Sequence, residues 1–258
     1  PAKRKGCVNK QATLPEPAND PQAIVDTIFK EVTPKTKVIA VPHIISGFGT
    51  VMPVKQICSE AKKRGIFTIL DGAQCVGHVK VDVKDIGCDA YYSSLHKWLL
   101  APAGSGLLYI NKDVVGGIWS TIASYNWDNQ DDHGFRLMQN GTGNAGLMAG
   151  YDAAVDFFNT IGHDVWIGRI KELGMHLRDG LKQMKHVTIY SSTNEELAAG
   201  ITTYGVEGMS GPDLQKYLWE KERLQPRSVG AKMLRHSVHI YNSKEEIDRA
   251  LNLISGLA

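Results

Sequence analysis

The chain has 258 residues, 43% hydrophobic and 22% charged, which is the balance of a soluble globular protein with one large domain or one large and one small domain. The formal net charge of +2 gives no reason to expect a nucleic-acid partner or an anionic membrane surface. No apolar run reaches the length of a membrane span, and we expect neither a span nor a signal peptide.

The first part of the chain alternates helical and strand-like segments. Apolar residues at helical spacing predict helices over 21–32 and 53–64, the first capped by Asp20 with Pro21 at its first position. Short apolar runs predict buried strands at 37–42, 67–71, 88–94 and 104–110. This alternation predicts an α/β fold with a mostly parallel, doubly wound sheet. Ligands of such sheets bind beyond the carboxyl ends of the strands, where Asp71 and Ser94 stand.

The second part of the chain changes character. A stretch rich in Gly, Asn and Asp predicts loops over 116–146, and two long helices separated by Gly162 are expected over 147–185. An α+β pattern then predicts strands at 186–192, 200–205, 223–229 and 236–242 and helices at 211–222 and 243–255. We therefore predict a large domain over 1–164 and a smaller α+β domain over 165–258.

The strongest local signal is the segment from Ser93 to Trp98, in which Lys97 follows hydroxyl residues and a histidine just past a strand end. A lysine amine becomes a nucleophile when desolvation or nearby positive charge lowers its pKa. Ser94 and His96 offer hydrogen bonds to an anionic group such as a phosphate. Taken alone, Lys97 is more often a solvated surface residue.

Asp71 ends an apolar strand, and a carboxylate buried there needs a partner. A protonated pyridine nitrogen is one such partner, and this ion pair lets the ring of pyridoxal phosphate (PLP) draw electrons from a carbanion. Gln74, one turn further on, is placed to hydrogen-bond the ring oxygen. Taken alone, Asp71 is equally consistent with a helix cap or a turn residue.

The order and spacing of these motifs resemble the class V, fold type I family of PLP-dependent aminotransferases. The matching series is Asp71–Gln74, Gly77–His78, Asp82–Val83, Gly87–Asp89, His96–Leu99 and Gly104–Tyr109. Within the family, the segment from Leu95 to Pro102 is most similar to the isopenicillin-N-epimerase-like branch, which also contains C–S lyases. The resemblance implies PLP as cofactor, a Schiff base on Lys97, and a small amino acid as substrate.

The same resemblance implies further roles. Ser46 is a weak candidate for a contact with the ring oxygen of the cofactor. Thr142 would reach the phosphate of the PLP bound to a neighbouring subunit, which implies a homodimer. A plainer interpretation of that segment is a loop followed by Asn144 as a helix cap. Arg235 is implied to bind the α-carboxylate, for which the two parallel donors of a guanidinium are suited. Its alternative is a surface arginine, and Arg227 is a second basic candidate.

The resemblance is incomplete ahead of the lysine, because only 96 residues precede Lys97. It implies that the N-terminal arm, the first strand of the large domain, the phosphate-binding turn and the ring-stacking residue are missing. We then expect an apolar edge and face of the sheet to be exposed. A fragment, a separate chain that supplies the missing part, and a degenerate paralogue within a larger assembly are three open explanations.

The four cysteines lack C-x-x-C spacing and neighbouring histidines, so we expect no metal site. Three of them lie in apolar surroundings, and a reducing compartment is expected, the cytoplasm or another intracellular one. The family's cysteine desulfurases need a mobile cysteine shortly before the carboxylate-binding arginine. Because no cysteine follows Cys88, the resemblance sets this subgroup aside.

The sequence therefore favours a PLP-dependent enzyme that acts on an amino acid or an amino-acid-like thioether. Transamination, epimerisation and β-elimination all begin with loss of the same α-proton, which Lys97 is suited to shuttle, so the shared residues do not separate these reactions. A truncated, non-catalytic paralogue with a structural role is the alternative. A nucleotide-binding P-loop or Rossmann site is disfavoured, because the chain has neither glycine motif in the required context.

Overall fold

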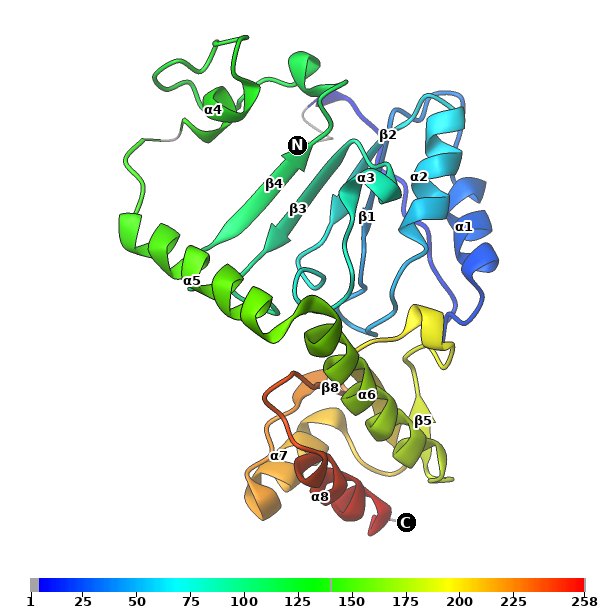
Figure 1. The fold of residues 1–258 in the computed structure, drawn as a ribbon. Helices are drawn as coiled ribbons and strands as arrows, with labels where there is room; N and C mark the ends of the chain where they lie inside the picture. Colours follow the sequence, from blue (N-terminus) through cyan, green and yellow to red (C-terminus); the bar gives the residue numbers. More distant parts are fainter. Residues whose placement is uncertain (1–4, 140, 258) are drawn as a thin grey trace.

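The computed structural model describes residues 5–139 and 141–257. Its strands form two four-stranded sheets, and two long helices run between them (Figure 1). None of the described helices is both long and apolar enough to cross a membrane.

The first sheet has the order β1-β2-β3-β4, in which the first three strands are parallel and β4 is antiparallel to β3. Leu70 and Tyr91 are fully buried in its two central strands. The predicted α/β fold with a mostly parallel sheet is therefore confirmed for this part of the chain. The strands are β1 (Val38–Pro42), β2 (Phe67–Asp71), β3 (Ala90–Ser94) and β4 (Gly106–Ile110).

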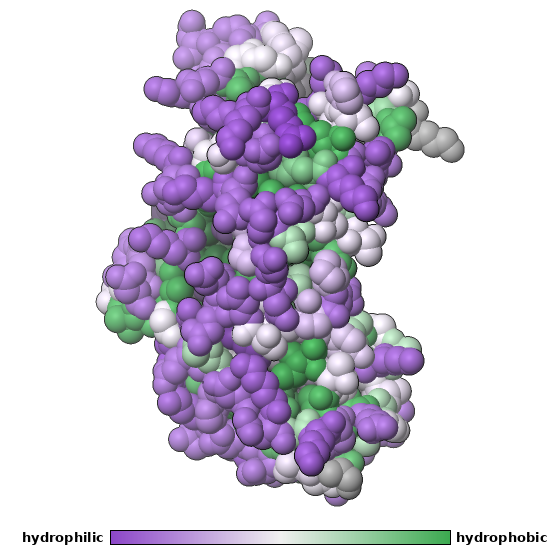
Figure 2. Space-filling model, turned by 90° about the vertical axis from the view of Figure 1, so that its right-hand side faces the viewer, coloured by the Kyte–Doolittle hydropathy of each residue, from purple (hydrophilic) through white to green (hydrophobic). Residues whose placement is uncertain are grey.

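Two amphipathic helices, α1 (Pro21–Lys30) and α2 (Val54–Lys63), pack beside β1 and β2, and a short helix α3 (Val83–Ile86) precedes β3 (Figure 1). The predicted start of α1 is confirmed, because the Asp20 side chain accepts a hydrogen bond from the Gln22 N–H at 2.9 Å and Pro21 is the first helical residue. The outer side of these helices is mainly hydrophilic, with apolar side chains visible only in gaps (Figure 2).

The segment between β4 and the next long helix holds a short 3-10 helix η2 (Val115–Gly117) and a helix α4 (His133–Met138). The loop predicted over 116–146 was wrong at α4, because the Asp132 side chain caps this helix by accepting from the Phe135 N–H at 2.8 Å. Arg136 is completely buried and donates to the backbone oxygens of Val115 and Ile118. The buried Arg136 side chain therefore holds this part of the segment through hydrogen bonds.

The two predicted long helices are α5 (Ala145–Ile161) and α6 (His163–Lys182), and they meet at Gly162 as expected. Trp166 and Ile170, near the start of α6, pack into the core of the first sheet. Leu173 and Leu177, further along the same helix, pack into the core of the second sheet. The predicted boundary after residue 164 falls in the first turn of this shared helix, and the division into two domains stays a prediction.

The second sheet is antiparallel, with the order β5-β6-β8-β7. The strand predicted at 236–242 was misplaced, because β8 ends at Ser237. The chain then turns where the His239 N–H donates to Asn242 Oδ1, and Ser243 and Glu246 form a capping box. The remaining elements are β5 (Val187–Ile189), η3 (Glu195–Leu197), β6 (Ile201–Val206), α7 (Gly211–Glu222), β7 (Arg227–Val229), β8 (Met233–Ser237) and α8 (Lys244–Ser255).

Candidate active site

Asp71 stands at the carboxyl end of β2, as the sequence predicts, and begins a tight turn. Its Oδ1 atom accepts a hydrogen bond from the Ala73 N–H at 2.8 Å. The Gly72 N–H donates to the Tyr92 oxygen of β3 at 2.7 Å. A Cβ atom at Gly72 would overlap the Tyr91 ring, so only glycine allows this turn to pack on β3. The carboxylate is thereby fixed at the strand end.

The turn that carries Lys97 is fastened to the turn that carries Gln74. The Trp98 indole N–H donates to Gln74 Oε1 at 2.8 Å, and the Ser93 hydroxyl donates to the Gly72 oxygen at 2.7 Å. These bonds join the loop after β2 to the end of β3 and to the loop that follows it, and β2 and β3 are neighbouring parallel strands. The structure therefore brings the predicted Asp71–Gln74 and Lys97 segments together.

Lys97 itself is exposed, whereas Leu95, Trp98 and Leu99 of the same turn are buried. His96 is also exposed and Ser94 is half-buried. Among the described residues, Lys97 has no hydrogen-bond or ion-pair partner. The desolvation invoked for Lys97 is thus not provided by the described part of the chain, because the apolar residues of the turn occupy the inward positions.

Ser46, Gln74 and Arg235 meet although they are far apart in the sequence. The Gln74 amide donates to the Ser46 hydroxyl at 3.1 Å, and Arg235 Nη1 donates to the Ser46 backbone oxygen at 2.7 Å and to its hydroxyl at 3.1 Å. The Nε atom of Arg235 is buried without a partner among the described residues. Burial, and then the charge of Arg227, lowers the pKa of Arg235. A buried unpaired donor at this place is suited to an anionic ligand.

An aromatic stack supports both turns from the side of the second sheet. Trp98 lies 3.5 Å from the His78 ring and 5.1 Å from the His239 ring, centroid to centroid, with nearly parallel planes. The Nε2 atom of His78 accepts from the Gly200 N–H at 2.7 Å, which assigns the proton to Nδ1, and Nδ1 donates to the Gln74 oxygen at 2.8 Å. Burial lowers the pKa of His78 to about 3, so this imidazole is neutral.

Sequence reasoning named His78 only as a member of the motif series and did not predict this supporting role. The available signal was Gly77 directly before it. Gly77 has φ of 84°, and a Cβ atom there would overlap the Trp98 backbone. A second buried support lies beneath Gly72, where His43 Nδ1 is 3.1 Å from the Tyr91 hydroxyl. Burial lowers the pKa of His43 to about 4, so this imidazole is uncharged at neutral pH.

Thr142 is not brought to the other predicted residues. It is exposed and lies just ahead of α5, whose first turn stands outside the edge strand β4 (Figure 1). The predicted helix cap at Asn144 is confirmed, because its side chain accepts a hydrogen bond from the Leu147 N–H of α5 at 3.2 Å. The predicted contact of Thr142 with a neighbouring subunit stays a prediction.

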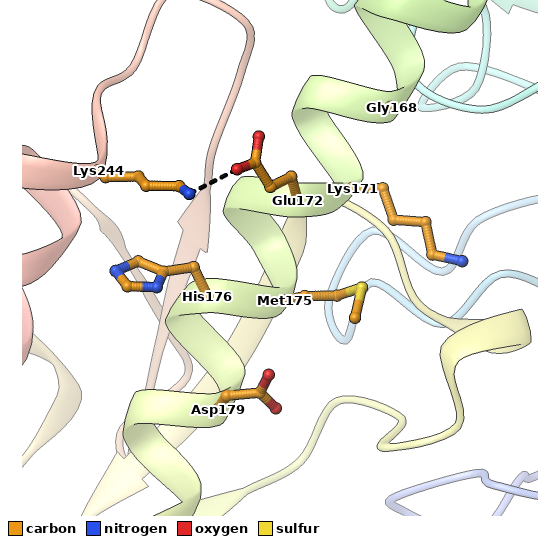
Figure 3. A pocket seen from close by; sticks show the side chains of 7 residues that line it. All are labelled: Gly168, Lys171, Glu172, Met175, His176, Asp179 and Lys244. Atoms are coloured by element: carbon orange, nitrogen blue, oxygen red, sulfur yellow. Dashed lines mark ion pairs between the residues drawn. The ribbon is translucent and has the colours of Figure 1, made fainter.

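The hollow shown in Figure 3 lies elsewhere, along α6 and the start of α8, and has a volume of about 450 Å³. In it Lys244 pairs with Glu172 at 2.5 Å (Figure 3). His176, which also lines the hollow, contacts Asp248 outside the lining at 2.6 Å. None of the predicted site residues lines it. Because Glu172 and His176 already pair with neighbouring side chains on an open surface, this hollow is a weaker candidate site than the strand ends.

The model of the family "Aminotransferase class-V" matches residues 9–250, and the chain belongs to this family. Isopenicillin N epimerase of Streptomyces clavuligerus is 29% identical over 274 residues, which span 99% of this chain and 69% of that protein. The apo cysteine desulfurase of Thermococcus onnurineus NA1 shares the fold, with a TM-score of 0.85, 23% identity, and coverage of 99% of this chain and 67% of that chain.

A second similar structure is a variant of C-DES with glycine covalently linked to its PLP cofactor, with a TM-score of 0.80 and 23% identity. This match covers 90% of this chain and 63% of that chain. PLP is the cofactor of the class V family, and the donor set described above fits it. Asp71 offers a carboxylate for a ring nitrogen, Gln74 and Ser46 offer polar groups for a ring oxygen, and Lys97 offers a free amine. The unpaired Nε of Arg235 adds an anion-binding donor beside them.

Proposed function

We propose that the chain holds PLP as a Schiff base on Lys97 and acts on an amino acid or an amino-acid-like thioether, as an aminotransferase, an epimerase or a C–S lyase. The observation that carries this proposal is a set of hydrogen bonds that join three segments of the chain. The turn of Asp71 and Gln74, the turn of Lys97, and Arg235 are linked through Trp98 and Ser46.

When bound, PLP supplies an electron sink for negative charge that develops at the substrate α-carbon. Asp71 would keep the ring nitrogen protonated, since an adjacent carboxylate favours the charged form of that group. Gln74 and Ser46 would hold the ring oxygen. Ser94, His96 and a Thr142 from a second copy of the chain would hold the phosphate.

Lys97 would move the proton at the substrate α-carbon, and its exposed amine is free of competing ion pairs among the described residues. Arg235 would orient the substrate by binding its α-carboxylate with the donors that Ser46 leaves free. Holding the carboxylate fixes which bond at the α-carbon faces the lysine, and such positioning is a large part of catalysis.

The similarity to a cysteine desulfurase does not extend to that enzyme's chemistry in our proposal. Cys58, Cys75 and Cys88 are buried, and burial raises their pKa values to about 12, 12 and 11. Cys7 is exposed but far along the chain from Arg235. Since no cysteine follows Cys88, a thiolate near Arg235 has no source in the second half of the sequence.

A non-catalytic role is the second candidate, and the exposure of Lys97 favours it. Desolvation is one way in which a lysine amine becomes a nucleophile, and an exposed lysine has no apolar surroundings that would provide it. In that case the fold would serve as a structural subunit, and the strand-end residues would be a remnant of the family's site.

Titration of the purified chain with PLP, followed by visible absorption, separates these two candidates. The proposal predicts a visible band that is lost in Lys97→Ala and kept in Lys112→Ala, a matched exposed lysine. Thermal unfolding of both variants controls for folding. A chain that shows no band once unbound PLP has been removed, or a band that survives in Lys97→Ala, would contradict the proposal.

A further inference from the structure

Three side chains stand in one row across the second sheet. Thr203 of β6 is paired with Arg235 of β8, and Arg235 is paired with Arg227 of β7. Residues directly opposite each other in antiparallel strands project from the same face, with Cβ atoms about 5 Å apart. The Thr203 hydroxyl donates to the Gly47 oxygen at 2.7 Å. This face of the sheet is therefore the one directed at the loop that carries Ser46.

Arg227 continues the row beyond Arg235 and is exposed. Two arginines directly opposite each other repel, and the neighbouring charge contributes to the lowered pKa of Arg235. Neither arginine forms an ion pair with a carboxylate in the part of the chain that the structure describes. The Nε atom of Arg235 is also buried and unpaired. Two adjacent positive charges at the candidate site are thus left without negative partners.

We propose that Arg227 binds a second anionic group of the substrate, so that the site selects amino acids with an acidic side chain. This inference rests on the proposed function, because it takes Arg235 as the anchor of the α-carboxylate. One carboxylate compensates one of the two guanidinium groups. A substrate with two acidic groups a few carbon atoms apart compensates both.

The plainer interpretation is that Arg227 keeps a short edge strand from pairing with other sheets, which is a common use of charged residues on edges. That role predicts no dependence on the charge of a ligand. The two interpretations are therefore distinguished by comparing ligands that differ only in their second carboxylate.

Calorimetric titration of the full chain without cofactor, with glutarate and with butyrate, makes this comparison. We expect glutarate to bind about tenfold more tightly than butyrate, as one charge-assisted hydrogen-bonded contact would provide. Arg227→Gln should abolish the preference without changing butyrate binding, and Arg227→Lys should keep part of it. Lys232→Gln, which removes one positive charge from the exposed turn between β7 and β8, should leave the preference intact.

Equal affinity for the two acids, or a preference that survives in Arg227→Gln, would overturn the inference. A parallel titration of the PLP-loaded chain with L-glutamate and L-glutamine is followed by its absorption spectrum. It distinguishes a failure of the proposed function from a failure of the role proposed for Arg227. A chain that never acquires a visible band refutes the proposed function, whatever glutarate does. A chain that acquires the band but responds equally to both amino acids refutes only the role of Arg227.

Discussion

The strand-end site and the segment over 111–144 are held in different ways. At the strand ends, the part-buried bond from Trp98 to Gln74 and the buried bond from Ser93 to Gly72 fix the turns. In the segment over 111–144, Trp119 is 53% exposed and Tyr125 is 76% exposed. The large aromatic side chains of the second region are therefore less buried than the turns of the first, although Arg136 is buried there. Substitutions in the two regions should therefore differ in their effects.

Gly72→Ala should have the largest effect on folding, because the added Cβ overlaps the Tyr91 ring, which is itself fully buried. Overpacking of this kind costs about 3 kcal/mol or more of the free energy of unfolding. Urea denaturation measures it. The matched control is Gly168→Ala, in an open position on α6, which should stabilise the chain by about 0.5–1 kcal/mol. Equal effects of the two substitutions would contradict the packing described at Gly72.

The pH dependence of stability should report three histidines around the site, of which His43 and His78 are buried and His236 is half-buried. Burial lowers the pKa values of His43 and His236 to about 4 and that of His78 to about 3, from an unfolded value of 6.5. The unfolded chain therefore binds more protons between pH 6.5 and about 4. Stability is complete above pH 6.5 and falls as the pH drops through this window, by about 2 kcal/mol for each histidine between pH 7 and pH 5.

Urea midpoints at pH 7 and pH 5 test this, with His78→Gln as the comparison. Glutamine does not titrate, so the variant should lose about 2 kcal/mol less between the two pH values than the parent chain does. Loss of packing alone lowers both midpoints together and leaves the difference unchanged. An identical difference in the two proteins would show that His78 is not held neutral.

Tyr125→Ser should have the smallest effect. Its side chain is largely exposed, so its removal should change the free energy of unfolding by less than about 0.5 kcal/mol. Thermal unfolding checks this value. A loss of about 2 kcal/mol or more would mean that the segment over 111–144 is packed as firmly as the strand ends, and the contrast between the two regions would disappear.

Much of the fold was predictable from the sequence because local signals and burial agree there. Asp20 and Pro21 mark the start of α1, and the apolar run at 67–71 coincides with β2. Asp71 and Ser94 therefore lie at strand ends, as predicted. Arg235 lies within β8, which begins and ends earlier than the strand predicted over 236–242.

The failures have physical causes of their own. The alternating pattern over 236–242 is typical of a strand, yet His239 and Asn242 satisfy the backbone with a turn that leads into α8. Asp132 caps a short helix inside a predicted loop. Lys97 is exposed, which agrees with the plainer interpretation of a lysine taken alone and not with the desolvation invoked for it, because other residues of its turn face the core. Local side-chain bonds to the backbone decide the first two cases, and tertiary packing decides the third.

Reduction with borohydride in the presence of PLP, followed by peptide mass analysis, tests the central claim most directly. The carboxylate of Asp71 and the amine of Lys97 are proposed to serve one cofactor. We predict a phosphopyridoxyl adduct on the peptide that contains Lys97, at much higher occupancy than on the exposed Lys112, and reduced labelling of Lys97 in Asp71→Asn. Labelling spread evenly over exposed lysines, or unaffected by Asp71→Asn, would contradict the account.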